Sequence, residues 1–326
     1  MASVCSPAGL SNFQRGKTCF NRAALVRLAN AWNASQAQGG DGRVERGWTP
    51  ITGIGRKNAA ELWKELNRRM AAKCGEDMSR EGCWVDTLLG NRVIGSGSDT
   101  VSDPAVGSVK PRKPRGWYKQ PFTWLTNLDI EAVMRQYEAD SDFKYAFLGV
   151  FPIDFAEKDA FGRCLVDEIC AIRIAPYIKR GVRYLGLITN LDRHDQSGSH
   201  WTSLFVCIDP SAACYGAYYY DSVGRPTPDG VTKFIESLRA QLREVYPEQD
   251  AAFKAEWNRN QHQFANTECG IFSMIYQIRW LKLLQAAASR KHGKAVVFQD
   301  IVNINLTDKD VHKLRDVLYR PEPVRT

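Results

Sequence analysis

The sequence predicts an α+β fold in which a buried helix with a cysteine at its start packs against a sheet of short strands. Cys269 comes two residues before Ile271, the first residue of the segment 271–284, whose apolar side chains fall on nearly every side of a helix. A helix that is apolar all round is buried inside a domain. Two apolar runs of strand length, residues 201–208 and 214–220, precede it and are separated by a turn signal at Asp209-Pro210.

Cys269 has the position of a reactive thiol. At a helix N-terminus, unpaired backbone N–H groups and the positive end of the helix dipole favour a thiolate over a thiol. Asn266 or Thr267 is expected to cap the helix, and Gly270 lets another backbone approach closely. Most cysteines are small buried apolar residues, which is the default interpretation for the other eight of the nine. Cys269 is therefore interpreted as a nucleophile only if the chain also supplies a base and a group that orients it.

His200 and Asp221 are the candidate partners. If the two apolar runs form an antiparallel hairpin, these residues face each other at its open end, because their midpoint falls between Pro210 and Ser211. A carboxylate there would hold the imidazole in the tautomer that accepts a thiol proton. Taken alone, His200 is equally well a structural histidine, and Asp221 is more readily a turn residue at a strand end. Their symmetry about one turn favours the chemical interpretation.

Four short motifs resemble the SUMO-protease and adenovirus-type group of cysteine peptidases: His200-Trp201, Tyr219-Tyr220-Asp221-Ser222, Gln263 and Cys269-Gly270. The resemblance implies a papain-like catalytic domain, with Cys269 as nucleophile, His200 as general base, Asp221 orienting it and Gln263 in the oxyanion hole. A side-chain amide beside the Cys269 backbone N–H would stabilise the developing negative charge. Gln261 is an alternative to Gln263, and only the spacing to the cysteine favours the latter.

Trp124 opens a segment that resembles the start of the catalytic domain in SUMO proteases. By that resemblance, Trp124 and Trp201 cover a narrow tunnel for a Gly-Gly substrate tail, beside Gly270. The segment departs from the cellular enzymes at Thr126-Asn127, where they have Asn-Asp. Without the resemblance, Asn127 is a helix cap and Trp124 a core residue.

The chain of 326 residues, 44% of them hydrophobic, is long enough for two domains. Residues 1–90 predict a helical accessory domain, since apolar side chains follow helical spacing in 22–33 and 58–74. Residues 91–115 are rich in Gly, Ser and Pro and predict a linker. Residues 116–326 are then the catalytic domain.

The positive charge lies outside that catalytic domain. Residues 1–115 contain 18 Lys and Arg against 10 Asp and Glu, which accounts for the whole net charge of +8. Such a region can bind nucleic acid, a nucleoprotein or another acidic surface, and a solvated basic surface is the alternative.

Several classes of protein are not predicted. No apolar run is long enough to span a membrane, and the N-terminus lacks the features of a signal peptide. Nine cysteines without paired spacing indicate free thiols in a reducing compartment. Because no histidine has ligand spacing to a cysteine, we expect no metal and no other cofactor.

The order of motifs also resembles the virion-maturation proteases of large double-stranded DNA viruses, namely the asfarvirus polyprotein protease and the poxvirus core protease. The segments that carry this resemblance are 18–25, 61–63, 83–84, 190–192, 197–201 and 306–315. Asp221 departs from the asfarvirus enzymes, which have Asn there. The resemblance implies an endopeptidase that cleaves structural polyprotein or core-protein precursors after Gly-Gly or Gly-X-Gly sites. It also implies a location in the host cytoplasm and the virion, without secretion.

Two alternatives to this function remain. A SUMO- or ubiquitin-deconjugating isopeptidase would use the same site. A non-catalytic nucleic-acid or scaffold-binding virion protein would instead work through its basic region.

Overall fold

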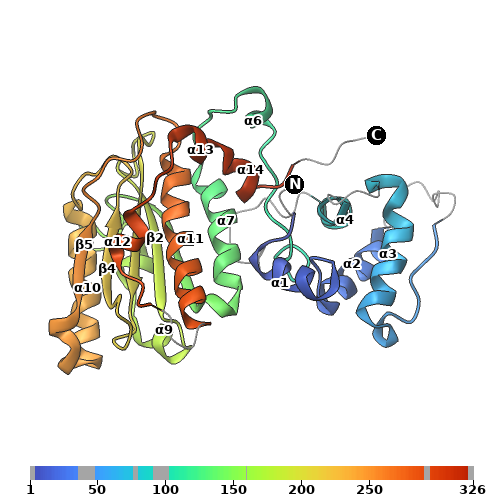
Figure 1. The fold of residues 1–326 in the computed structure, drawn as a ribbon, viewed down its shortest axis with the longest axis horizontal. Helices are drawn as coiled ribbons and strands as arrows, with labels where there is room; N and C mark the ends of the chain where they lie inside the picture. The colour runs from blue at the N-terminus through green and yellow to red at the C-terminus, as the bar shows by residue number, and fades with distance from the viewer. Residues whose placement is uncertain are drawn as a thin grey trace. The chain divides into compact units, whose positions relative to one another are not determined.

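The computed structural model describes residues 4–35, 48–75, 80–90, 103–158, 160–289 and 294–321. The chain forms two compact units. Unit 1 contains the residues up to 119 together with those from 315 onward, and unit 2 contains residues 120–314 (Figure 1).

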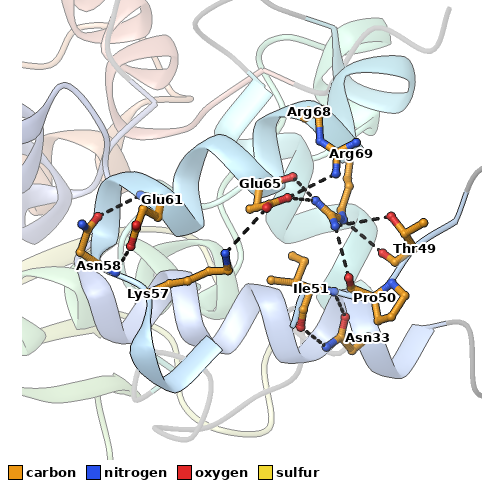
Figure 2. Close-up of polar contacts among 10 residues, drawn as sticks. All are labelled: Asn33, Thr49, Pro50, Ile51, Lys57, Asn58, Glu61, Glu65, Arg68 and Arg69. Carbon is orange, nitrogen blue, oxygen red and sulfur yellow. Dashed lines mark hydrogen bonds and ion pairs between the residues drawn. The ribbon is translucent and has the colours of Figure 1, made fainter. Parts of the chain in front are cut away.

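Unit 1 is helical, as the sequence predicts for its first part. Its helices are α1 (Pro7–Gly16), α2 (Arg22–Ser35), η1 (Ile54–Arg56), α3 (Ala59–Cys74), α4 (Arg80–Leu89), α6 (Gly116–Lys119) and α14 (Arg315–Leu318). Leu25, Leu62 and Trp84 lie in a core shared by α2, α3 and α4. The helices predicted at 22–33 and 58–74 are therefore present, and Asn58 begins α3 through a reciprocal capping bond with Glu61 (Figure 2).

Arg69 ties the extended segment before η1 to α3. Its guanidinium donates to the carbonyls of Thr49 at 3.1 Å and Pro50 at 3.3 Å, and it pairs with Glu65 on its own helix (Figure 2). Asn33 of α2 exchanges two hydrogen bonds with the backbone of Ile51, at 2.8 and 3.0 Å. The segment is thus fixed to two helices, by partly buried contacts with Asn33 and exposed contacts with Arg69.

The predicted linker is wrong for its second half. Residues 91–102 lie outside the described residues, but Ala105 and Val109 are buried in the core of unit 1. The Pro-rich run that follows makes backbone hydrogen bonds rather than crossing solvent: Lys113 N–H donates to the Arg320 carbonyl, and Arg320 N–H donates to the Pro111 carbonyl. The Pro-rich run is thus held in unit 1 by backbone hydrogen bonds, although it forms no helix or strand.

The predicted catalytic domain is also too long at its C-terminal end. The Arg320 guanidinium bonds both carboxylate oxygens of Asp86, at 2.6 and 2.7 Å. Tyr319 packs edge-on against Trp117 at a ring separation of 4.9 Å. The last described residues are therefore part of unit 1, a pairing distant in sequence that local patterns do not encode.

The expectation of free thiols is wrong for six of the nine cysteines. Disulfides join Cys5 to Cys19, Cys74 to Cys83 and Cys164 to Cys170, whereas Cys207, Cys214 and Cys269 are free. The three pairs have separations of 14, 9 and 6 residues, so no repeated spacing in the sequence predicts these disulfides.

Unit 2 is a mixed sheet with helices on both faces, and this confirms the predicted α+β fold (Figure 1). The strands lie in chain order: β1 (Tyr145–Pro152), β2 (Tyr184–Asn190), β3 (Trp201–Cys207), β4 (Gly216–Tyr220) and β5 (Lys254–Trp257). The outer pairs are parallel and the inner pairs antiparallel. The helices are α7 (Asn127–Ala139), η3 (Ser141–Phe143), α8 (Asp167–Cys170), α9 (Ala175–Lys179), α10 (Asp229–Val245), η4 (Pro247–Ala252), α11 (Cys269–Ala288), α12 (Phe298–Val302) and α13 (Asp308–Lys313).

Alternating side chains of the strands divide the core between the two faces. One face packs against α10 through Leu185, Val206 and Leu238, among others. On the other face, Phe205 stacks on Trp280 of α11 at 4.8 Å. Gln277, also of α11, donates to the Leu187 carbonyl at 3.0 Å. These contacts fix α11 against the centre of the sheet and so fix the position of its first residue.

Among the described helices, none combines the length and the apolar character needed to cross a bilayer.

Candidate active site

Cys269 is the first residue of α11 and is only 2% exposed. The backbone N–H groups of the first helical turn have no partner within the helix, so they favour negative charge at the sulfur. The expected cap is wrong: the helix begins after Glu268, and neither Asn266 nor Thr267 caps it. The Thr267 hydroxyl instead donates to the Glu268 carboxylate at 3.5 Å.

His200 and Asp221 are in direct contact, with Nε2 and Oδ1 2.6 Å apart. The predicted pairing of His200 with Asp221 is wrong by two residues. Ser203 pairs with Tyr220, so the position across from Asp221 is Thr202. An error of two keeps the same face of the sheet, so His200 and Asp221 meet as diagonal neighbours rather than directly across the hairpin. The predicted contact between His200 and Asp221 is therefore present although the predicted register is not.

The environment of His200 favours its protonated form. Burial lowers the pKa of the ring, but hydrogen bonds to Asp221 and Cys269 and the charges of both outweigh it and raise the pKa to about 9. Nε2 faces Asp221, so Nδ1 is the nitrogen left for the sulfur. At neutral pH the ring is therefore protonated, and it hydrogen-bonds the side chains of both Asp221 and Cys269.

Asp221 is held by its backbone as well as by His200. Its N–H donates to the Asn258 side chain at 2.9 Å, and the Asn258 amide donates to its carbonyl at 2.7 Å. Val223 N–H donates to Oδ1 at 2.9 Å, while Oδ2 is buried and has no hydrogen-bond partner within the described ranges. Sequence reasoning missed Asn258, because an asparagine after a short strand gives only a turn signal.

Gln263 lies beside this pair, since its Oε1 accepts from the hydroxyl of Ser222 at 2.6 Å. Its amide nitrogen donates one hydrogen to the Ala265 carbonyl at 2.6 Å, which leaves the second hydrogen for a substrate oxygen. Gln261 donates to the Gln263 carbonyl at 2.8 Å and so supports this segment. His262 packs on Tyr220 instead, with its ring centre 5.7 Å away, as expected for a side chain on the opposite face.

Two of the three predicted substrate-binding residues, Trp201 and Gly270, lie together at the start of α11. Trp201 donates its indole N–H to the Leu125 carbonyl at 3.0 Å. A Cβ on Gly270 would lie 3.2 Å from Trp201 Cδ1 and 3.3 Å from Leu125 Cβ. Trp124 is 42% exposed, so it is not the core residue that its size alone suggests. Glycine at 270 thus keeps the backbone next to Cys269 close to both neighbouring segments.

A second His-Asp pair has a different role. His194 Nδ1 lies 2.6 Å from Asp154, and this hydrogen bond raises the pKa of the largely exposed ring. Arg193 approaches the same carboxylate at 3.5 Å. These contacts fix the loop that leads from β2 to His200.

The described residues contain one group with metal-ligating atoms close together, formed by Cys5, Cys19 and Glu81 of unit 1. The two sulfurs are joined in a disulfide. The Glu81 carboxylate accepts from Thr18, Trp63 and the Cys19 backbone at 2.6 to 2.8 Å. The ligand atoms are already used, so the group does not fit a metal ion.

Comparison with known proteins identifies the relatives of this chain. No protein-family model matches it. Over 98% of its length it is 27% identical to thiol protease R355 of Acanthamoeba polyphaga mimivirus, of which the alignment covers 94%. A shorter stretch, 44% of the chain, is 26% identical to the SUMO-1 cysteine protease S273R of African swine fever virus and covers 46% of it. The crystal structure of the African swine fever virus pS273R protease matches 79% of this chain and 91% of its own, with a TM-score of 0.52 at 17% identity.

The chain is therefore homologous to viral thiol and cysteine proteases and has the fold of the African swine fever virus enzyme. The predicted resemblance, the protease fold and the class of cysteine-type peptidase are confirmed.

Proposed function

We propose that this homologue of viral thiol proteases is a cysteine endopeptidase that processes structural polyprotein or core-protein precursors during virion maturation. The observation that supports this most directly is the contact of His200 with both Asp221 and Cys269, which raises the pKa of the imidazole to about 9. An ion pair of thiolate and imidazolium is the form in which cysteine peptidases attack an amide.

In the proposed reaction, the Cys269 sulfur attacks the carbonyl carbon of the cleaved bond. The oxyanion is stabilised by the Cys269 backbone N–H and the free amide hydrogen of Gln263. His200 then gives its proton to the leaving amine, and the C–N bond breaks to leave a thioester. A water molecule gives a proton to His200 and its oxygen to the thioester carbon, which releases the acid product and restores the thiolate.

We further propose cleavage after Gly-Gly or Gly-X-Gly sites. The position of Trp201 supports it, because its Cδ1 lies only 3.2 Å from where a Cβ of Gly270 would be, so a large aromatic ring stands beside Cys269 and would compete for space with substrate side chains. Peptides with Ala or Val in place of the last glycine test this preference.

Replacing the nucleophile is the central test. We expect Cys269→Ala to abolish the processing of virion precursors while leaving the melting temperature nearly unchanged, since the buried sulfur is small. Cys214→Ala, which removes another buried free thiol, is the matched control and should process normally. Mass spectrometry of the products identifies the cleaved bonds. Cleavage by Cys269→Ala equal to wild type would contradict the proposal and revive a non-catalytic role.

A deconjugating isopeptidase is the second candidate, favoured by the name of the African swine fever virus relative as a SUMO-1 cysteine protease. Incubation with SUMO and ubiquitin conjugates, alongside Gly-Gly precursor peptides, separates the two. Faster cleavage of the conjugates would favour the isopeptidase.

We also propose that the basic residues 1–115 contact the precursor or a nucleoprotein, and that the enzyme acts in host cytoplasm and is packaged in the virion. Recovery of the chain from purified virions tests the location. Retention of the chain on immobilised nucleic acid, lost at moderate salt, tests the charged contact.

A further inference from the structure

The polypeptide from Gln263 to Cys269 carries the two donors of the proposed oxyanion hole. Gln263 contributes a side-chain amide hydrogen and Cys269 a backbone N–H. The described residues 258–268, between β5 and α11, form no helix or strand that would set the spacing of these donors. Gln263 is anchored at Ser222, since its N–H donates to the Ser222 carbonyl at 2.9 Å. Residues 264–268 need other contacts to fix them.

Asp308, the first residue of α13, fixes the start of that stretch. Its Oδ2 accepts hydrogen bonds from the N–H groups of Phe264 and Ala265, at 2.9 and 3.1 Å. The Ala265 carbonyl in turn accepts the Gln263 amide at 2.6 Å, which orients the amide and directs its second hydrogen. One carboxylate oxygen of α13 therefore holds the backbone that orients Gln263.

His312, also in α13, fixes the end of the stretch. Its Nδ1 lies 2.8 Å from the carboxylate of Glu268, which directly precedes Cys269 and is 1% exposed. A buried carboxylate is tolerated only where it is hydrogen-bonded or paired. The Glu268 carbonyl accepts the Phe272 N–H at 2.9 Å and so closes the first turn of α11. The position of this turn, and with it the Cys269 N–H, is thereby tied to His312.

Both contacts come from one face of α13. Asp308 and His312 are four residues apart and thus lie on the same side of the helix. The helix is itself held by a capping box between Thr307 and Asp310 and by Val311, whose side chain is fully buried. It packs against α11 (Figure 1). A single element, the α13 brace, therefore bonds both ends of the stretch.

We propose that Asp308 and His312 are positioning residues of the peptidase reaction, which together fix the spacing between the Gln263 amide and the Cys269 backbone N–H. This inference rests on the proposed function. Within the described residues, neither side chain hydrogen-bonds the nucleophile, the imidazole or the carboxylate of the triad. Donors that are in place when the oxyanion forms stabilise the transition state more than the bound substrate. Loss of the α13 brace should therefore lower kcat and leave KM nearly unchanged.

Asp308→Ala and His312→Ala test the brace on a Gly-Gly peptide joined to a fluorogenic amine. Each should lower the kcat of the full-length enzyme about tenfold to a hundredfold with little change in KM, because displaced oxyanion donors have costs of that size. Asp308→Asn keeps a carbonyl oxygen that can accept from both N–H groups, so it should retain most of the kcat. Lys309→Ala, which removes an exposed side chain of the same helix, is the matched control. A wild-type kcat in either alanine variant of the brace would overturn the proposal.

Two chemical probes distinguish a displaced oxyanion hole from a damaged nucleophile. Iodoacetamide forms an S–C bond with loss of iodide and creates no oxyanion, so Cys269 of Asp308→Ala should be alkylated at the wild-type rate, as followed by mass spectrometry. A Gly-Gly peptide aldehyde adds to the sulfur and places its oxygen in the oxyanion position, so its affinity should fall about tenfold or more. Alkylation slowed as much as kcat would overturn the proposal.

The aldehyde also separates this inference from the proposed function. Weaker aldehyde binding by Asp308→Ala, with no precursor cleavage by the wild-type enzyme, would support the brace and contradict the endopeptidase. Precursor cleavage by Asp308→Ala at the wild-type rate would contradict the brace and support the endopeptidase. Failure of the wild-type enzyme to bind the aldehyde would contradict both.

Discussion

At the scale of single residues, the site depends on how Asp221 is held. Its carboxylate orients His200, but its backbone is fixed by the Asn258 side chain through two hydrogen bonds of 2.7 and 2.9 Å. Asn258 touches neither His200 nor Cys269 in any described contact and is therefore a positioning residue. A small displacement of Asp221 would move the imidazole away from the sulfur.

We expect Asn258→Ala to lower kcat by roughly tenfold to a hundredfold with little change in KM, because misplacement by about 1 Å has costs of that size. Loss of two buried hydrogen bonds should also lower the free energy of unfolding by about 1–3 kcal/mol. Steady-state kinetics and urea unfolding measure both. Asn260→Ala, an exposed neighbour, is the control, and an unchanged kcat in Asn258→Ala would refute the positioning role.

The pH dependence of the reaction should report on His200. The raised pKa of about 9 means that the imidazolium persists at neutral pH and is lost as the pH rises through that value. We expect the alkaline limb of kcat/KM near pH 9. Asp221→Asn removes a charge that raises this pKa, so its alkaline limb should move to lower pH. An alkaline limb at the same pH in Asp221→Asn and in the wild type would show that Asp221 does not raise the pKa of His200.

Sequence reasoning could find His200, Asp221 and Cys269 because their chemistry limits the residue types and their spacing. It could not fix the hairpin register: the observed pairs are centred between Ser211 and Ala212, one position after the midpoint between Pro210 and Ser211 that the turn signal suggests. Nor could it find Asn258, whose role arises only when β5 brings it next to the end of β4.

At the scale of elements, α11 combines burial with a close approach at its first turn. Its apolar sequence predicts a buried helix, and the stacking of Trp280 on Phe205 shows how the sheet holds it. Its cap was not predictable from the sequence, because Glu268 and the segment before it are fixed by His312 and Asp308 from α13, more than forty residues later. A capping residue can be predicted from the local sequence only where the groups that fix the start of the helix are also close in sequence.

Gly270→Ala should separate stability from activity. Alanine favours a helix over glycine by up to about 1 kcal/mol, but its Cβ would press on Trp201 and Leu125 at 3.2 and 3.3 Å. We expect a small change in melting temperature and a clear loss of kcat/KM on Gly-Gly peptides, since the two segments must move where the substrate passes. Differential scanning fluorimetry and peptide kinetics measure the two effects. Undiminished kinetics would argue against substrate passage at this point.

At the scale of the whole molecule, the division into units is not the one that composition suggests. A Pro-rich basic run resembles a linker, yet residues 103–119 belong to unit 1 together with the segment from Arg315 onward. Pairing between residues more than two hundred positions apart, such as Asp86 and Arg320, leaves no trace in local sequence patterns.

Deletion variants should follow the observed boundaries. We expect residues 120–314 to cleave short peptides but to lose precursor processing, because the basic residues are absent. A variant that lacks only residues 1–110 should be less soluble, since it exposes Arg320 and Tyr319 without Asp86 and with the Trp117 segment unsupported. Peptide cleavage, precursor cleavage and gel filtration compare the two. Full precursor processing by residues 120–314 would contradict a docking role for unit 1.

The pairing of Asp86 with Arg320 also sets an order for biosynthesis. Residues 120–314 leave the ribosome as one continuous stretch and hold every proposed catalytic group. Unit 1 stays incomplete until Arg315 and the residues after it emerge. The part of unit 1 that is made first therefore cannot complete its packing until the far end of the chain is available.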